Sequence, residues 1–399
     1  MLGTWIQSVA VMWLAYRLSG STLFTGLVGF LNSAPYLVLS PLAGVLGDRL
    51  PRRKILIAVH CLLMANAVVL AVLTGLELIT MPTLAAIALF AGLCNAFETP
   101  TRQSLFVQLL EDRTDLPNAI ALNSILMNGT RLVGPSIGGV LIAAFGETVC
   151  FTINAFSFLA VLAALLGTRV VHRRPPREAS HPLADLAEGW RYAMGFAPAR
   201  RMLFTLAAVS FSISPYATLM PAIAVKTFSE GAELVGLFIG AVGLGAVVSA
   251  VSLARRSSIR GLAKWIGIAA VVAGLGAIGF CFSRTVWASA LLMMMAGFGM
   301  FMTGATCNTI LQSVVDEDKR SRVMSYYTMF FIGAAPLGHF AAGWLAELVG
   351  APYTFLAGGV ISALAGLLFL ARIQSFRDEL RPLYVSRGII PAPSGEPPQ

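Results

Sequence analysis

The feature that most limits the fold of this chain is a succession of apolar stretches, each about 20 residues long and almost free of charge. Twelve such stretches cover residues 2–18, 24–47, 54–76, 81–107, 118–143, 148–168, 201–226, 232–254, 263–283, 286–312, 322–346 and 352–372. None of them alternates apolar and polar residues as a barrel strand would. Because only helices and closed barrels satisfy their backbone groups in lipid, the sequence predicts an all-α membrane protein with twelve transmembrane helices.

The amino-acid composition also indicates that most of this chain lies in a lipid bilayer. Only 12% of the 399 residues are charged, about half the share in soluble domains, so a soluble surface could not be covered. The hydrophobic share of 57% excludes intrinsic disorder over most of the length. The five cysteines are scattered and the four histidines have no metal-ligand spacing. We therefore expect no disulfide scaffold, no metal and no cofactor.

The basic residues predict how the helices are oriented. Of the 28 Lys and Arg residues, 23 fall in the six segments that one face of the membrane would share, whereas Arg17, Lys226 and Arg284 fall on the other face. Cytoplasmic segments carry such an excess, so the C-terminus and the long connection at 169–200 are predicted to be cytoplasmic. Contact with anionic lipid accounts for the net charge of +9 without any nucleic acid.

The long connection also divides the stretches into two sets of six. The two sets of six stretches show weak sequence similarity, since Gly26-Leu27 corresponds to Gly236-Leu237 and Pro135 to Pro336. The sequence therefore predicts a duplicated six-span unit, as in transporters built from parallel repeats. The predicted divisions are an N-terminal six-helix bundle (1–168), a cytoplasmic linker with an interfacial helix (169–200), a C-terminal six-helix bundle (201–372) and a cytoplasmic tail (373–399). The apolar face of the linker helix would consist of Leu183, Leu186, Trp190 and Met194.

The segment that joins the second and third stretches carries a charged signature. Its pattern, Gly-x-x-x-Asp-Arg-x-x-Arg-Arg, is formed by Gly44, Asp48, Arg49, Arg52 and Arg53. The glycine allows close helix approach, the aspartate can lie against a helix N-terminus, and the arginines reach the headgroups. The segment resembles the signature loop of the major facilitator superfamily. The resemblance implies a gating loop that latches two bundles in one state and releases them in another.

Longer matches narrow this resemblance to one branch. The fifth stretch contains Gly134-Pro135-Ser136-Ile137-Gly138-Gly139, which is similar to the antiporter motif of drug exporters and whose small residues permit close helix packing. Segments 97–103, 116–119 and 131–135 resemble the enterobactin-exporter-like branch, also called the transmembrane secretion effector family. Relatives in this branch begin with a basic lead and a complete first span, whereas Met1 falls inside that span. The first helix is therefore expected to be truncated, unless the start codon is misassigned.

Three charged residues, Glu98, Arg102 and Arg131, fall inside the predicted spans. Burying each costs at least about 2.5 kcal/mol, so each needs a reason. Glu98 and Arg102 are four residues apart and share one helix face, and the spacing also allows an ion pair from Glu98 to Arg131 on the next helix. One hypothesis makes Glu98 the proton-accepting group, with Arg131 tuning its proton affinity. The alternative is a permanent pair of Glu98 with an arginine that holds the cytoplasmic ends of the first bundle together.

Uncharged polar residues supply candidates for a central cavity, which the superfamily resemblance places between the first, fourth, seventh and tenth helices. The candidates are Gln7, Asn95, Ser210, Ser214, Tyr216, Thr306 and Asn308. For any one of them, a hydrogen bond between helices is the more common role. Pro215 and Pro221 are predicted to kink the seventh helix.

Transport is the function that these features favour. The resemblance implies a secondary transporter that exports a small molecule, siderophore-like or amphipathic, across the bacterial inner membrane by proton-coupled alternating access. An importer of the same fold and a non-transporting membrane sensor are the alternatives. The sequence contains no phosphate-binding glycine loop, metal-ligand pair or nucleophile with a base, so an enzyme is not expected. The expected partners are a small-molecule substrate, protons and the lipid bilayer, and the chain is expected to be a monomer.

Overall fold

The computed structural model describes residues 1–49, 51–108, 116–167, 190–191, 193–256, 261–315 and 317–386. These residues form helices joined by short turns, and no strand occurs among them. The all-helical fold predicted from the apolar stretches is confirmed for this part of the chain.

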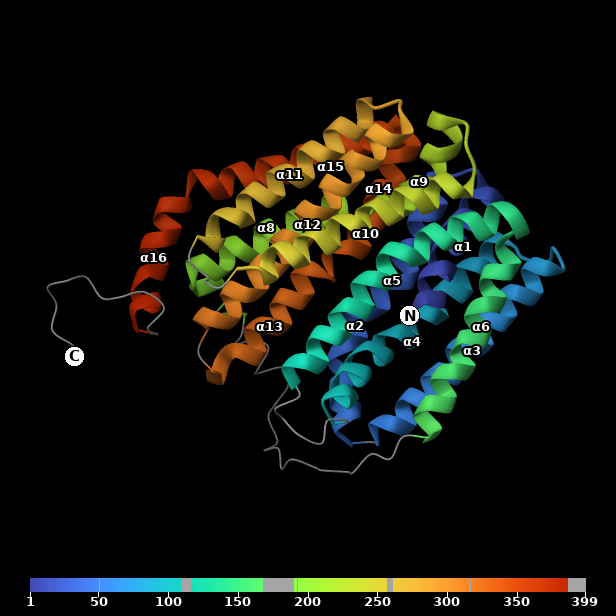
Figure 1. Cartoon of the computed structure of the whole chain (residues 1–399), viewed down its shortest axis with the longest axis horizontal. Helices are drawn as coiled ribbons and strands as arrows, with labels where there is room; N and C mark the ends of the chain where they lie inside the picture. The colour runs from blue at the N-terminus through green and yellow to red at the C-terminus, as the bar shows by residue number, and fades with distance from the viewer. Residues whose placement is uncertain are drawn as a thin grey trace, which may run out of the picture.

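The first six apolar stretches correspond to one helix each. They are α1 (Leu2–Ser19), α2 (Thr22–Arg49), α3 (Arg52–Gly75), α4 (Met81–Gln108), α5 (Leu116–Phe145) and α6 (Glu147–Gly167). The later stretches contain α8 (Ala197–Ile213), α9 (Tyr216–Ile223), the π-helical turn η2 (Ala224–Phe228), α10 (Ala232–Ala254), α11 (Leu262–Phe282), α12 (Val286–Val314), α13 (Glu317–Phe331), α14 (Ala334–Val349) and α15 (Ala351–Ala371). One more helix, α16 (Ile373–Ser386), follows the last stretch (Figure 1).

Ten helical segments of the described chain are long and apolar enough to cross a membrane. They are Arg52–Gly75, Met81–Gln103, Ile125–Phe145, Glu147–Gly167, Ala197–Phe228, Ala232–Ala254, Leu262–Phe282, Val286–Val314, Val323–Val349 and Ala351–Ala371. α1 and α2 precede these segments and cover the first two predicted stretches. The multi-span character predicted from the sequence is therefore present in the structure.

Two of these segments are interrupted near a proline. α8 ends at Ile213, and Pro215 is the N-cap of α9. Proline lacks a backbone N–H and its ring displaces the carbonyl four residues earlier. At Pro215, where the sequence predicts a kink, one helix ends and the next begins, whereas α9 continues through Pro221 to Ile223. The eleventh stretch is divided at Gly333, although the sequence predicts one continuous helix over 322–346. Pro336 explains this difference, because its ring excludes a regular helical bond back to Ile332.

Helix packing joins distant parts of the sequence. α3 packs against α4 and α6, and α11 packs against α12 and α15. Two extensive contacts connect early helices to late ones, namely α2 with α14 and α5 with α10. Figure 1 shows α5 and α10 side by side, between the blue-to-green helices and the yellow-to-red helices. The candidate site lies along these two contacts.

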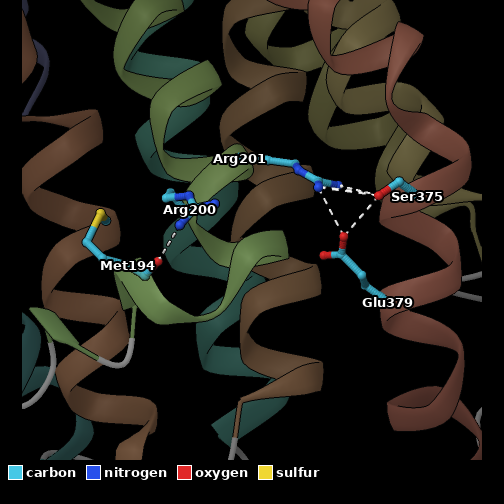
Figure 2. A network of polar contacts seen from close by, with 5 residues as sticks. All are labelled: Met194, Arg200, Arg201, Ser375 and Glu379. Carbon is cyan, nitrogen blue, oxygen red and sulfur yellow. Dashed lines mark hydrogen bonds and ion pairs between the residues drawn. The ribbon is translucent and has the colours of Figure 1, made fainter.

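The segment after the last span begins with a docked helix, where the sequence predicts only a tail over 373–399. α16 contacts α8, α11, α12 and α15, and its Phe376 and Leu380 are each 1% exposed. Arg201 of α8 donates hydrogen bonds to Ser375 Oγ and, at 3.0 Å, to Glu379 Oε1 (Figure 2). The two apolar residues are four apart and share one helix face, which is why the chain folds back there.

Most of the predicted linker at 169–200 lies outside the described residues, and so do Leu183 and Leu186 of its interfacial helix. Trp190 and Met194 are described and helical. The indole of Trp190 lies over Phe330 of α13, with ring centroids 6.3 Å apart. The carbonyl of Met194 accepts a hydrogen bond of 2.9 Å from Arg200 (Figure 2). The end of the linker is thus fixed against α13 and α8.

Candidate functional site

α5 and α10 cross at a pair of glycines. A Cβ atom on Gly139 would lie 2.6 Å from the carbonyl oxygen of Ala232 and 2.9 Å from Cα of Gly236. A Cβ atom on Gly236 would lie 2.5 Å from the carbonyl oxygen of Pro135. Neither position can hold a side chain, because the obstructing atoms belong to the backbone. Small residues allow such close approach of helices in lipid, so this crossing depends on both glycines.

α2 and α14 cross in the same way. A Cβ atom on Gly26 would lie 2.8 Å from Cα of Gly343, and one on Gly343 would lie 2.6 Å from the carbonyl oxygen of Thr22. Gly26 and Gly236 are the two glycines that echo each other in the sequence. The crossings lie near the turns at Gly20, Gly146, Gly231 and Gly350, and we call this region the closed end.

A carboxylate of α14 caps the first turn of α2 at the closed end. Glu347 Oε2 accepts hydrogen bonds from the backbone N–H groups of Thr22 at 2.9 Å and Leu23 at 3.2 Å. The hydroxyls of Ser21 and Thr22 donate to the same oxygen, at 3.0 and 2.9 Å. These N–H groups have no partner within their own helix, and an anion is favourable beside a helix N-terminus. Glu347 therefore stabilises the α2–α14 contact.

A second charged contact at the closed end lies within the early helices. Arg17 Nε of α1 is 2.6 Å from Glu147 Oε1 of α6, and the Glu147 side chain is buried. Both residues line a cleft of about 670 Å³ between the ends of α1, α3, α5 and α6. Loss of the arginine would leave a buried carboxylate unpaired, which is costly. The pair holds α1 to α6.

The small-residue motif of α5 faces two different helices. A Cβ atom on Gly134 would lie 2.5 Å from Cβ of Trp5 in α1, and one on Gly138 would lie 3.2 Å from the backbone of Ile6. Gly139 faces α10, as described above. Pro135 lies inside α5, which continues past it to Phe145. The predicted motif therefore lies where α1, α5 and α10 meet.

Arg131 lies about one turn before this motif, and aromatic rings surround it. Its guanidinium carbon is 4.3 Å from the ring centroid of Phe301 in α12 and 5.4 Å from that of Trp5. Tyr216, buried at the start of α9, lies within electrostatic range. Nε of Arg131 is buried and has no hydrogen-bond partner among the described residues. Four helices therefore contribute to one cationic, aromatic-lined position.

The cost of burying the Arg131 guanidinium exceeds what its aromatic neighbours return. A cation at the bilayer centre costs at least about 2.5–3.5 kcal/mol on insertion scales. A cation–π contact returns about 0.5–2 kcal/mol. The five N–H donors of a guanidinium match the geometry of a planar oxyanion. No carboxylate is paired with Arg131 in the described part of the chain.

Glu98 pairs with Arg102 rather than with Arg131. Arg102 Nε donates to Glu98 Oε1 at 2.7 Å along one face of α4. The Thr99 hydroxyl donates to Glu98 Oε2 at 3.0 Å. Of the two geometries that the spacing allowed, the i, i+4 pair is the one present. Both side chains keep some exposure, 15% for Glu98 and 26% for Arg102, so the protein encloses the pair only in part.

The remaining cavity candidates divide by their contacts. Ser210 Oγ donates to the carbonyl of Phe331, and Gln7 accepts a hydrogen bond of 2.7 Å from Asn154 of α6. Asn308 accepts from Gln312 on its own helix. The hydroxyl of Thr306 is buried and has no hydrogen-bond partner in the described part of the chain, and Asn95 and Ser214 are half-buried. Gln7 and Ser210 therefore act between helices, and Thr306 places an unsatisfied hydroxyl on α12.

The comparison with known families decides what kind of protein this is. A family model described as transmembrane secretion effector matches residues 1–383. The chain belongs to the transmembrane secretion effector family. Its curated relatives are transporters, among them one described as of the major facilitator type, so the chain is a multi-pass membrane transporter and not an enzyme.

Individual relatives agree with this assignment. The chain is 23% identical to a staphyloferrin A transporter of Staphylococcus aureus, with 92% of each chain covered. It is 27% identical to the multidrug efflux pump Tap of Mycolicibacterium fortuitum, with 93% of each covered. A bacterial homologue of the human lysosomal transporter Spinster, in an inward-facing and unoccupied conformation, has a TM-score of 0.70 at 15% identity over 95% of both chains. The last likeness concerns the fold alone.

The signature segment of this transmembrane secretion effector is described in part. The backbone at Gly44, Asp48 and Arg49 forms the last turns of α2, and their side chains lie outside the described part. Arg52 begins α3. Arg53 donates to the carbonyls of Leu165 and Leu166 at 2.6 and 2.7 Å, and so caps the C-terminus of α6. A cation at a helix C-terminus is favourable.

Several residues at the site carry no signal in the sequence. Trp5 and Phe301 are ordinary apolar residues of their spans, and only the fold brings them to Arg131. His339 is an isolated histidine within an apolar stretch, and it forms a 2.6 Å hydrogen bond with Thr218 that joins α14 to α9. Glu347 had one available signal, since a carboxylate in the last turn of a span is rare. No cluster of three potential metal ligands occurs among the described residues.

Proposed function

We propose that this transmembrane secretion effector has twelve membrane-spanning helices in two pseudo-symmetric six-helix bundles, 1–168 and 201–372, joined by the cytoplasmic linker 169–200. The two related glycine crossings support this division, because α2 and α5 of the first bundle meet α14 and α10 of the second. α8, α9 and η2 then form one span, and α13 and α14 another. The C-terminus, with α16, lies in the cytoplasm of a bacterial cell, and the closed end faces outward.

The proposed activity is export of a small molecule across the inner membrane by alternating access. The observation that carries it is that both crossings close the same end, with the cationic and aromatic position of Arg131 behind them. In the other state, the bundles would separate at this end and meet at the end that holds Gly44, Asp48, Arg49, Arg52 and Arg53. The direction of transport is taken from a relative described as a multidrug efflux pump. The chain is proposed to act as a monomer.

Proton coupling is the finer part of this proposal, and Glu98 is its candidate. A carboxylate within the membrane that water can reach is a common proton carrier in transporters. Protonation of Glu98 would release Arg102, whose Nε is 2.7 Å from it in the present state. The alternative, a permanent Glu98–Arg102 pair with a purely structural role, makes the opposite prediction for the neutral variant.

A cell-based efflux experiment tests the transport proposal. The chain is expressed in a bacterial host without its own drug and siderophore exporters, and the compounds that leave the cell are measured by mass spectrometry with and without a protonophore. Export is expected only in expressing cells, and the protonophore should abolish it. Accumulation of a solute inside the cells would indicate an importer, and no flux in either direction would favour the sensor.

The Glu98→Gln variant separates coupling from structure. It keeps the size and one acceptor of the side chain but cannot be ionised. We expect loss of the protonophore-sensitive flux with unchanged expression and unchanged melting temperature. The matched control is Glu230→Gln, an exposed carboxylate in the turn before α10. Proton-dependent export that persists in Glu98→Gln would reject the coupling role of Glu98.

A further inference from the structure

Arg131 is a half-buried cation that has no ion-pair partner among the described residues. Its Nε is enclosed and lacks a hydrogen-bond partner among the described residues, whereas part of the side chain remains accessible. The neighbouring contacts are the faces of two aromatic rings, Phe301 and Trp5. Rings attract a cation but accept no N–H hydrogen bonds in the plane of the guanidinium. The enclosed Nε is out of reach of a guest, so the donors offered to a guest are the two outer nitrogens of the guanidinium, which have no hydrogen-bond partner among the described residues.

The surroundings of Arg131 come from both sides of the α5–α10 contact. Trp5 belongs to α1, Tyr216 to α9 and Phe301 to α12, and a Cβ atom on Gly243 of α10 would lie 2.7 Å from the carbonyl oxygen of Arg131. No acidic side chain pairs with Arg131 in the described part of the chain. The position therefore has net positive charge and an apolar, aromatic wall.

We propose that Arg131 determines the substrate class of this transporter by binding a carboxylate or similar planar oxyanion that is attached to an aromatic or other flat apolar group. The guanidinium would hold the oxyanion through two parallel N–H bonds, and Trp5 and Phe301 would pack on the flat group. A cationic substrate of similar size would be repelled from this position. This assignment rests on the proposed function only in placing Arg131 on the substrate path.

Binding can be measured without transport, so the anion site at Arg131 can be rejected independently of the proposed export. Purified protein in phosphatidylcholine nanodiscs is titrated with 1-naphthoate and, as an uncharged counterpart of the same shape, 1-naphthamide, by isothermal calorimetry. The unaltered protein should bind naphthoate at least about tenfold more tightly than naphthamide, the amount expected from one charge-assisted pair. Equal binding of the two probes would overturn the assignment even if export is observed in cells.

Two variants test the residue itself. Arg131→Gln should lose the preference for naphthoate while naphthamide binding is unchanged, and Arg131→Lys should keep part of it, because the charge remains but the planar fork is lost. The control is Arg256→Gln, which removes a cation of the same kind, 5.0 Å from the Trp265 ring, at the other end of α10. An equal loss of both probes in Arg131→Gln with a lowered melting temperature would make Arg131 a packing residue and overturn the proposal.

One further arm separates a soluble anion from a lipid headgroup. The titration of the unaltered protein is repeated in nanodiscs that contain phosphatidylglycerol. Unchanged naphthoate affinity is the expected result. Competition by phosphatidylglycerol that Arg131→Gln abolishes would assign the site to anionic lipid instead of substrate.

Discussion

Glu347 provides a direct test of how the closed end is held. Its Oε2 atom accepts four hydrogen bonds, one from Ser21 just before α2 and three from the first turn of α2, and two of the four come from backbone N–H groups. In Glu347→Ala, those two N–H groups lose their partner. The contact joins α14 to α2 across the region that must separate for the closed end to open, so the variant should favour opening.

The magnitude follows from the exposure of this carboxylate. Loss of a helix N-cap costs about 0.5–2 kcal/mol, and an anion beside a helix N-terminus contributes about 0.3–1 kcal/mol. Glu347 is exposed, so water replaces part of what is lost, and Ser21 Oγ still accepts from the N–H of Phe24 at 3.3 Å. We therefore expect about 1–1.4 kcal/mol against the closed state, which changes the equilibrium between closed and open by roughly five- to tenfold.

Distance measurements between spin labels report this equilibrium. Labels are attached through Phe145→Cys at the end of α5 and Leu348→Cys at the end of α14, two exposed positions on opposite sides of the closed end. Cys61, the exposed native cysteine, is replaced by serine. Glu347→Ala should add a longer distance to the distribution, and Glu347→Gln, which keeps an acceptor, should add less of it.

The control variant is Glu233→Gln, an exposed carboxylate in the first turn of α10 at the same end. It should leave the distance distribution unchanged. If Glu347→Ala gives the same distribution as the unaltered protein, the cap does not hold the closed end, and the glycine crossings alone must do so.

Two more predictions concern packing. Gly139→Leu puts a side chain against the backbone of α10, which should cost about 1–3 kcal/mol and widen the same label distance. Gly129→Leu on the same helix, where a Cβ meets nothing within 4 Å, should leave that distance unchanged. An unchanged distance in Gly139→Leu as well would mean that α5 tolerates a large side chain at the crossing. Phe376→Ala removes a ring that is 1% exposed, which should destabilise the protein by about 3–5 kcal/mol and lower its melting temperature. Arg377→Ala, which changes an exposed neighbour, should leave the melting temperature unchanged. An unchanged melting temperature for Phe376→Ala would show that α16 adds nothing to the stability of the fold.

The fold was largely predictable because lipid leaves few choices to an apolar stretch. Each stretch could be assigned as a helix from its length, and the break at Pro215 followed from the chemistry of proline. The break at Gly333 was missed, although Pro336 carries the same signal, because the apolar run continues across it. α16 was missed because it follows the last apolar stretch, and the amphipathic pattern of its 14 residues gives a weaker signal than a long apolar run.

The site was predictable only where one helix determines it. The Glu98–Arg102 pair follows from a spacing of four residues on one helix. The surroundings of Arg131 cannot be predicted from such a spacing, because Trp5 and Phe301 come from helices that are far apart in the sequence. The sequence marks a charge that needs a partner, but which groups meet it depends on the tertiary packing of α1, α5 and α12.

The position of Arg131 links the closed end to the proposed binding site. Arg131 lies on α5, about two turns from Gly139, where α5 crosses α10. Its guanidinium contacts Trp5 on α1, which packs on α5, and Phe301 on α12, which packs on α10. If the crossing at Gly139 and Gly236 separates, α1 moves with α5 and α12 with α10, so the two rings around the guanidinium are drawn apart. An anion held between them in the closed state would then lose one wall of its site. A single cation placed at this distance from a glycine crossing is therefore sufficient to make release of an anion depend on opening of the closed end.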